Sequence, residues 1–210
     1  MQTTFPRMLL KHAAERPDAP AMREKEYGIW QAHSWSNMAT LVEHIACGLH
    51  LAGLKRHEHM VVIGANRPRL YATMLAAQSL GAIPIPLYQD AVGAECVFPI
   101  TNADVRLAMV EDQEQVDKLL EIRDRCPDLA TLIYDDPRGL RNYADAGLSS
   151  LDALIDAGRA FAQSHPQLFI SEINKGQAAD VAAMFFTSGT TGNPKGVVHT
   201  HNTLLDRAHA

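Results

Sequence analysis

Apolar residues along the chain recur at helical spacing first between residues 36 and 53, where they mark a helix with one buried face. The positions that form this stripe are Met38, Leu41, Val42, Ile45, Ala46 and Leu49. Ser36 is predicted to cap the start of the helix, and Gly53 stands where a left-handed residue commonly ends one. This segment therefore predicts an amphipathic helix that lies on a core.

The next segments change from helical spacing to short apolar runs. Residues 59–65 contain the uninterrupted run Met60 to Ile63, which is typical of a strand covered on both faces. Residues 70–80 are apolar nearly all round and predict a buried helix that ends at Gly81. Residues 83–87 predict another strand, and its two prolines, Pro84 and Pro86, favour an edge or irregular position because proline donates no ladder hydrogen bond.

The alternation continues in the middle of the chain. Residues 105–110 and 131–134 are predicted strands, and between them Asp112 and Gln115 resemble a capping box that opens a helix. The core face of this helix is Val116, Leu119 and Leu120. Strands that alternate with helices of this length predict an α/β fold with a mostly parallel sheet and helices on its faces.

The last third of the chain is less regular. Residues 135–149 are rich in Asp, Pro, Gly, Arg and Asn and predict a surface connection, followed by a helix over 151–161. Residues 164–180 are expected to form a second helix and a loop. Residues 181–186 and 196–200 are predicted strands, and Asn202 is predicted to cap a final short helix that contains Leu204, Leu205 and Ala208.

Composition indicates an ordinary globular protein and argues against several classes of partner. The chain has 210 residues, 47% hydrophobic and 20% charged, with a formal net charge of -5. This charge gives no general attraction to nucleic acid or to an anionic membrane surface, so we expect no nucleic-acid partner. No apolar run approaches the length of a membrane span, and the N-terminus does not resemble a signal peptide. We therefore expect a cytoplasmic protein.

The three cysteines, Cys47, Cys96 and Cys126, are widely spaced and form no CxxC pair. We expect each to be a small buried apolar residue in a reducing compartment.

The most informative stretch is TSGTTGNPKG, residues 187–196, between two predicted strands. Glycines let backbone N–H groups converge, hydroxyls add donors and Lys195 adds charge, which together suit phosphate oxygens. The spacing fits neither the GxxxxGK[ST] loop nor the GxGxxG dinucleotide motif. A flexible turn with a solvated lysine is the plainer alternative, but ten consecutive positions of this chemistry favour a phosphate-binding loop.

These ten residues resemble the corresponding motif of the adenylate-forming superfamily, which includes acyl-CoA synthetases, adenylation domains and luciferases. The resemblance extends over essentially the whole chain. It includes residues 5–17 and 34–54, which look like the opening helix and the helix after the family's first strands, together with ANRP at 65–68 and LGAIPIPLY at 80–88. VEDQEQVDKLL at 110–120 and IYDDPRGL at 133–140 look most like bacterial long-chain fatty acyl-CoA synthetases. The resemblance implies the N-terminal part of the family's layered αβαβα large domain.

The resemblance also implies a reaction. A carboxylate attacks the α-phosphate of ATP to give an acyl-adenylate and pyrophosphate, and the thiol of CoA then displaces AMP. The loop would close over the β- and γ-phosphates, with Thr190 nearest the Mg²⁺ and Lys195 neutralising the departing pyrophosphate. The implied nucleotide-binding residues are Thr187, Ser188, Gly189, Thr190, Thr191, Gly192, Lys195 and Gly196.

Other family residues have no counterpart before residue 210. The resemblance places the Mg²⁺-binding glutamate, the ribose-binding aspartate, the hinge, the catalytic lysine and the small C-terminal domain after this point. Residues 1–210 are thus expected to be a partial AMP-binding domain that is inactive by itself and leaves apolar sheet surface uncovered, which would favour self-association. Within the chain, Pro99 falls inside a stretch that the family usually folds as a helix, so we expect either a helix that starts near Pro99 or a kinked one.

Several alternatives stay open. The acid is expected to be a fatty acid, but a carrier-protein or aryl-acid ligase and an inactive nucleotide- or partner-binding module are alternatives. Peripheral membrane contact and a homodimer are also open. His199 and His201 would share one face if both lay on a strand; a third metal ligand is not identifiable, so they suggest a packed His199 and a His201 near the nucleotide rather than a metal site. His57 and His59 look like solvated surface.

Overall fold

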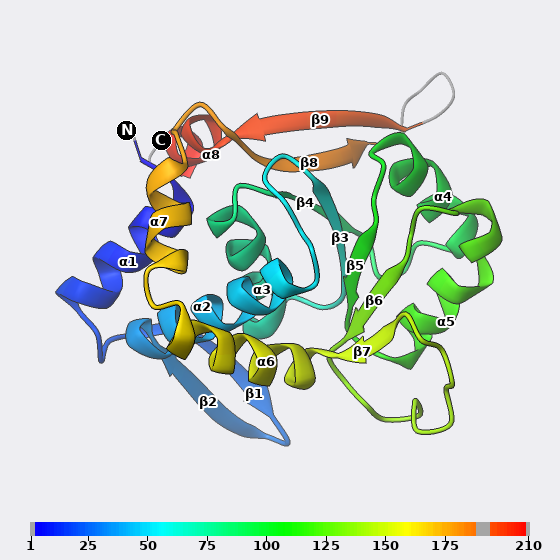
Figure 1. Ribbon diagram of the computed structural model, residues 1–210, viewed down its shortest axis with the longest axis horizontal. Helices are drawn as coiled ribbons and strands as arrows, with labels where there is room; N and C mark the ends of the chain where they lie inside the picture. Colours follow the sequence, from blue (N-terminus) through cyan, green and yellow to red (C-terminus); the bar gives the residue numbers. More distant parts are fainter. Residues whose placement is uncertain (1–2, 188–193, 209–210) are drawn as a thin grey trace.

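The centre of the protein is a five-stranded parallel sheet, seen in a computed structural model that describes residues 3–187 and 194–208 (Figure 1). The strands lie in the order β4-β3-β5-β6-β7, and every neighbouring pair is parallel. Their bounds are β3 His59–Ile63, β4 Ile83–Leu87, β5 Leu107–Val110, β6 Thr131–Tyr134 and β7 Leu148–Ser150. The predicted α/β fold with a mostly parallel sheet is confirmed.

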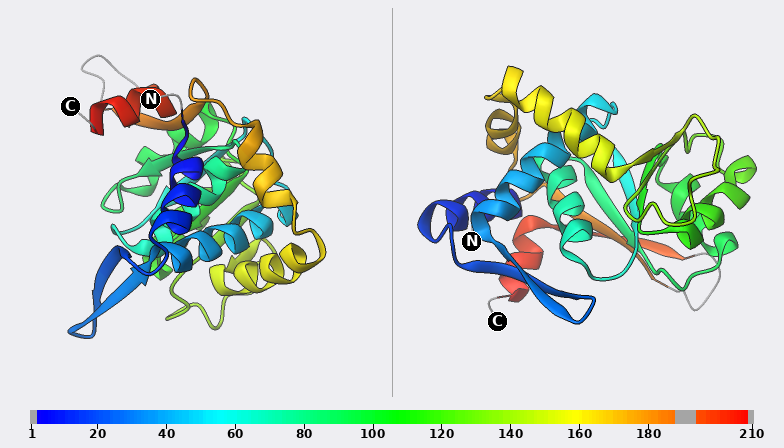
Figure 2. Two further views of the ribbon diagram at one scale, coloured as in Figure 1. Left: turned by 90° about the vertical axis from the view of Figure 1, so that its left-hand side faces the viewer. Right: turned by 90° about the horizontal axis from the view of Figure 1, so that it is seen from below.

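Helices cover both faces of this sheet. On one face the apolar side chains of α1, α2, α3, α6 and α7 join those of alternate strand positions; on the other face lie α4 and α5 (Figures 1 and 2). The helices are α1 Phe5–Glu15, α2 Trp35–Leu51, α3 Pro68–Ser79, α4 Gly93–Asn102, α5 Gln113–Glu121, α6 Leu151–Ser164, α7 Leu168–Lys175 and α8 His201–Ala208, with a short 3₁₀ turn at Arg123–Arg125.

The alternation within β3 shows how the two faces are filled. Met60 and Val62 belong to the core under α2, whereas Val61 and Ile63 belong to the core under α4 and α5. Because successive side chains of a strand point to opposite faces, this uninterrupted apolar run requires cover on both sides. The sequence prediction for this strand is confirmed.

Two antiparallel hairpins lie outside the parallel sheet. One pairs β1 (Pro20–Glu26) with β2 (Ile29–Ser34), and the other pairs β8 (Val181–Thr187) with β9 (Lys195–Thr200). The first extends away from the body at the lower left of Figure 1, and the second crosses the top of the molecule. The hydrophobic pattern did not predict the first hairpin, because most of its side chains are exposed on both faces.

Several local predictions are confirmed and two caps are wrong. Asp112 caps α5 by accepting a hydrogen bond from the Gln115 N–H at 3.2 Å, as predicted. Helix α2 is capped by Ser34, whose hydroxyl accepts from the Asn37 N–H at 3.2 Å, rather than by Ser36. At α8 the capping contact is the Thr200 hydroxyl accepting from the Thr203 N–H, not Asn202.

Two further differences concern the elements themselves. Residues 148–150 of the predicted surface connection form β7, which was too short to show a pattern. Helix α4 begins at Gly93 and runs through Pro99, so the helix does not start at the proline. Strand β4 lies at one end of the strand order, as its two prolines predicted.

All three cysteines are free and buried, which confirms that expectation. Burial raises the pKa of the Cys47 thiol to about 11. Within the described residues no helix is long and apolar enough to cross a bilayer.

Candidate functional site

The predicted phosphate-binding stretch, residues 187–196, includes the last residue of β8 and the first residues of β9, two strands that pair antiparallel. Thr187 ends β8, Lys195 begins β9, and their Cα atoms are direct partners in the antiparallel register. Opposed residues of an antiparallel pair project to the same face, so the hydroxyl of Thr187 and the ammonium of Lys195 lie on one face of the strand pair. Both side chains are exposed. A hydroxyl donor and a cation side by side suit an anionic oxygen ligand.

The central residues of the predicted loop are Ser188, Gly189, Thr190, Thr191 and Gly192, and they lie outside the described residues. The structure therefore places three of the eight predicted nucleotide-binding residues, Thr187, Lys195 and Gly196. It brings these three together where β8 ends and β9 begins. The roles assigned to Thr190 stay predictions.

The β8–β9 hairpin is held near both of its ends, by an aromatic contact next to Thr187 and by a hydrogen bond near the start of β8. The ring of Phe186 meets the ring of Phe98 on α4 edge-on, with centroids 6.2 Å apart and an angle of 88° between the planes. Gln78 of α3 donates from Nε2 to the carbonyl of Ala182 at 2.8 Å. The hairpin thus contacts both α3 and α4, and these contacts position Phe186 and Ala182 of β8 relative to the helices on the two faces of the parallel sheet.

Gly196 packs against the flexible end of the Met184 side chain within the hairpin. A Cβ at this position would lie 2.1 Å from Cε of Met184 and 3.4 Å from the ring of Phe186. Glycine therefore leaves space for the end of the Met184 side chain beside the first residues of β9. This gives the last glycine of the motif a structural role in addition to the predicted ligand contact.

The two histidines after the loop have different surroundings. His199 is half-buried on β9, and its ring contacts that of Phe185 with the centroids 5.7 Å apart. This agrees with the sequence interpretation of a packed His199. His201 is the first residue of α8 and only 4% exposed. Its Nδ1 accepts a hydrogen bond from the Phe5 N–H at 3.3 Å.

This environment decides the chemistry of His201. Burial lowers its pKa to about 4, with the Asp180 carboxylate acting in the opposite direction. The imidazole is therefore neutral near pH 7, as its acceptor role toward Phe5 requires. The structure places His201 at the contact between α8 and α1, at the other end of β9 from Lys195. Within the described residues no group of three His, Cys, Asp or Glu side chains could hold a metal ion.

A second polar cluster, which the sequence analysis missed, lies at the carboxyl ends of the parallel strands. Arg69 of α3 pairs with Asp135 after β6 at 2.7 Å and with Asp152 of α6 at 2.6 Å. Glu111, after β5, accepts from Arg67 Nε at 2.8 Å and from the Ala65 N–H at 2.5 Å. Ligands of open α/β sheets commonly bind at this edge. The available signal was an acidic residue immediately after each of two predicted strands.

Burial raises the pKa of the Asp135 carboxyl to about 6, although the Arg69 guanidinium acts to lower it, and Asp152, Glu111 and Asp136 raise it further. Each of the two arginines, Arg67 and Arg69, is already shared between carboxylates. The cluster thus ties together the loops after three strands.

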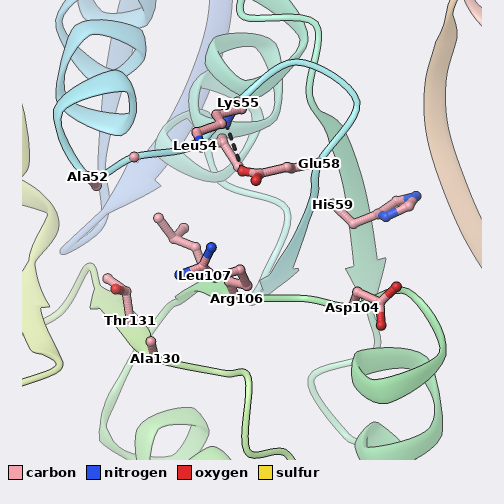
Figure 3. Close-up of a pocket in the computed structure, with 11 residues that line it drawn as sticks. Ala52, Leu54, Lys55, Glu58, His59, Asp104, Arg106, Leu107, Ala130 and Thr131 are labelled. Atoms are coloured by element: carbon pink, nitrogen blue, oxygen red, sulfur yellow. Dashed lines mark hydrogen bonds between the residues drawn. The ribbon is translucent and has the colours of Figure 1, made fainter.

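A cavity of about 240 Å³ lies at the opposite edge of the sheet, between the end of α2 and the starts of β5 and β6 (Figure 3). Its lining carries charges of both signs: the cations Lys55 and Arg106 and the anions Glu58 and Asp104. Glu58 accepts from the Lys55 N–H at 2.9 Å. None of the described motif residues lines this cavity, so it is separate from the hairpin.

Known proteins are similar to this chain in both sequence and fold. The sequence profile of the AMP-binding enzyme family matches residues 9–210. The chain belongs to this family. It is thereby a member of the adenylate-forming superfamily that the loop resembles.

Curated relatives of the AMP-binding chain are long-chain-fatty-acid–CoA ligases. It is 27% identical over 188 residues to ACSBG2 of Homo sapiens, covering 88% of this chain and 27% of the relative. It is 23% identical over 198 residues to FadD15 of Mycobacterium bovis, covering 94% of this chain and 31% of the relative. The chain thus spans roughly a quarter to a third of the length of these relatives.

Solved structures support the fold of this AMP-binding chain. The anthranilate CoA ligase AuaEII, in complex with anthranoyl-AMP, superposes with a TM-score of 0.78 at 18% identity, covering 95% of this chain and 35% of that one. The N-terminal domain of FACL13 from Mycobacterium tuberculosis gives a TM-score of 0.72 at 22% identity, covering 95% of this chain and 44% of that one.

Proposed function

We propose that the β8–β9 hairpin holds the β- and γ-phosphates of ATP in an AMP-forming acyl-CoA ligase. The observation that carries this proposal is the pairing of Thr187 with Lys195, the two residues that flank a glycine- and hydroxyl-rich stretch of the sequence. Backbone N–H groups of such a turn and one ammonium stabilise the charge that develops on the departing pyrophosphate. In this proposal Lys195 neutralises that charge and Thr190 lies nearest the Mg²⁺.

The proposed substrates are ATP, a fatty acid of long chain length and CoA. The names of the curated relatives support the fatty acid, whereas AuaEII supports the alternative of an aryl acid. We also propose that residues 1–210 form part of a larger adenylate-forming domain, since they match about a third of each relative. The acyl-transfer step then belongs to a protein that also contains the parts of the relatives that this chain does not match.

Phosphate binding is tested on this chain directly. We expect titration with Mg²⁺-pyrophosphate and with ATP, followed by calorimetry, to show binding that Lys195→Ala weakens roughly tenfold or more, because a charge-assisted hydrogen bond to a phosphate is lost. Lys11→Ala is the matched control, since Lys11 is an exposed lysine on α1. Equal affinity of the wild-type chain and Lys195→Ala would contradict the proposal.

Turnover is a separate measurement. Incubation with ATP, Mg²⁺, CoA and either palmitate or anthranilate, followed by detection of AMP and acyl-CoA, distinguishes the fatty acid from the aryl acid. Pyrophosphate binding without turnover by this chain agrees with the expectation that further residues are needed. Binding of AMP and pyrophosphate by a protein that contains those residues, but no acyl product with any acid, would favour the inactive nucleotide-binding module.

A further inference from the structure

The tip of the β1–β2 hairpin exposes three large apolar side chains in four consecutive residues. Tyr27 is 87% exposed, Ile29 is 64% exposed and Trp30 is 67% exposed. They stand at the end of a hairpin that extends away from the helices in all three views (Figures 1 and 2). Isolated exposed apolar residues are ordinary, but three at one convex tip are a concentrated apolar surface.

The backbone conformation at this tip is unfavourable for Tyr27, because its φ is positive. Tyr27 has φ of 47° and Gly28 has φ of 83°, the two left-handed conformations of a tight hairpin turn. Glycine adopts this conformation readily and Asn or Asp adopt it at moderate cost, whereas a bulky aromatic residue is strained there. Tyr27 is an aromatic residue at a position that favours Asn or Asp. This suggests that its exposed ring has a role in contacting a binding partner.

Strand register separates the charges behind the tip. Lys25 is the partner of Trp30, and Arg23 is the partner of Ala32, so Arg23, Lys25 and Trp30 share one face of the hairpin. A shallow hollow of about 300 Å³ on this face is lined by Arg23, Trp30 and Ala32. Glu24 and the exposed Glu26 lie on the opposite face together with Ile29, the partner of Glu26; Glu24 is engaged by His33 at 3.1 Å and by Arg67 at 3.6 Å. One face therefore combines a tryptophan with two cations.

We propose that this hairpin tip is a membrane-docking element that inserts into the interface of an anionic phospholipid bilayer. Tyrosine and tryptophan favour the headgroup region, where an apolar ring and a polar edge are both accommodated. Lys25 is the strand partner of Trp30, and Arg23 lies two residue pairs further from the turn, so both can meet the lipid phosphates at that depth. A convex apolar tip fits a fluid interface, whereas a folded protein partner would need a matching pocket.

Long-chain fatty acids partition into bilayers, so membrane docking would bring the protein to the proposed substrate. This link between docking and substrate rests on the proposed function. Membrane docking itself does not depend on the proposed ligase function. The net charge of the whole chain, -5, opposes approach to an anionic surface. Insertion of the apolar tip must therefore supply much of the affinity, and the two cations must act locally.

The experiment uses the fluorescence of Trp30. The chain has two tryptophans, and the second, Trp35, is half-buried against His12, so Trp35→Phe leaves Trp30 as the reporter. Vesicles of phosphatidylcholine alone and with phosphatidylglycerol are added without ATP or fatty acid. We expect a blue shift of emission, quenching by brominated lipid and co-sedimentation with the vesicles, strongest with phosphatidylglycerol.

Variants separate insertion from charge. In chains that keep Trp35, Ile29→Ser with Trp30→Ser is expected to reduce co-sedimentation on both vesicles about tenfold or more, through lost apolar burial. Lys25→Glu is expected to reduce it several-fold on phosphatidylglycerol and little on phosphatidylcholine. Tyr88→Ser, which removes an 84% exposed aromatic residue outside the hairpin, is the matched control and should leave binding unchanged. Circular dichroism and thermal melts confirm that each variant folds.

Two results would overturn the proposal. One is unchanged Trp30 emission on both kinds of vesicle. The other is an emission shift without lipid that grows with protein concentration and is lost in an Ile29→Ser variant that keeps Trp30, because the tip would then bind a second copy. Failure of docking leaves pyrophosphate binding by the β8–β9 hairpin untouched, so the two proposals fail independently.

Discussion

At the scale of single residues, Asp135 is the group whose charge state most directly affects stability near neutral pH. Its carboxyl is mostly buried, and its ion pair with Arg69 does not fully compensate for that burial, because the pKa is raised to about 6. The native state therefore binds this proton more tightly than the unfolded chain. The contribution of Asp135 to stability is present at low pH and is lost as pH rises through about 6.

We expect Asp135→Asn to remove this pH dependence. Relative to the variant, the wild-type protein should gain roughly 2–3 kcal/mol in free energy of unfolding as pH falls from about 7 to about 4. Urea unfolding of both proteins at several pH values measures the difference. Asp152→Asn is the control, because Asp152 pairs with the same guanidinium but is exposed. A constant difference between wild type and Asp135→Asn across this range would show that the carboxyl is not perturbed.

At the scale of elements, the tightest contact is the crossing of α2 and α6 at two glycines. A Cβ at Gly158 would lie 1.9 Å from the His44 carbonyl oxygen and 2.6 Å from the Gly48 nitrogen. A Cβ at Gly48 would lie 2.5 Å from the Leu154 carbonyl oxygen. These neighbours are backbone atoms, so a methyl group can be accommodated only if the helices move apart.

Gly158→Ala is therefore expected to destabilise the protein by about 1–3 kcal/mol or more through overpacking, although alanine is the better helix former. Thermal and urea unfolding measure the loss. Ala157→Leu adds more volume at the neighbouring, exposed position of α6 and should stay within about 0.5 kcal/mol of wild type. Equal stability of Gly158→Ala and wild type would mean that α2 and α6 separate at little cost.

The elements also show what the sequence could predict. Strand β3 and helix α2 were predictable because burial on a sheet or helix face imposes a period on the sequence. The β1–β2 hairpin lacks that period, since both of its faces are exposed, and β7 is only three residues long. The motif was sufficient to predict the candidate site. The direct pairing of Thr187 with Lys195 depends on the strand register, and the ion pairs of Arg69 depend on tertiary packing, so neither could be predicted from the sequence.

At the scale of the whole molecule, the parallel sheet is covered and the two hairpins are open. Both proposed binding surfaces lie on these hairpins, and the helices on the two faces of the sheet hold the scaffold between them (Figure 1). Strand β9 is open on both faces, because the consecutive residues Val197 and Val198 are 39% and 55% exposed. In the described residues β9 pairs with β8 alone. An apolar edge of this kind can pair with another strand.

We expect this open edge to make the 210-residue chain self-associate as its concentration rises. Light scattering should show a mass that increases with concentration, and a dye specific for apolar patches should bind. Val198→Lys should shift the mass toward the monomer, since a lysine at an edge opposes strand pairing. Trp30→Ser, on the other hairpin, should leave the mass unchanged, which separates this edge from the proposed membrane-docking tip. A monodisperse monomer with a cooperative melt and no dye binding would show instead that β9 tolerates exposure without pairing.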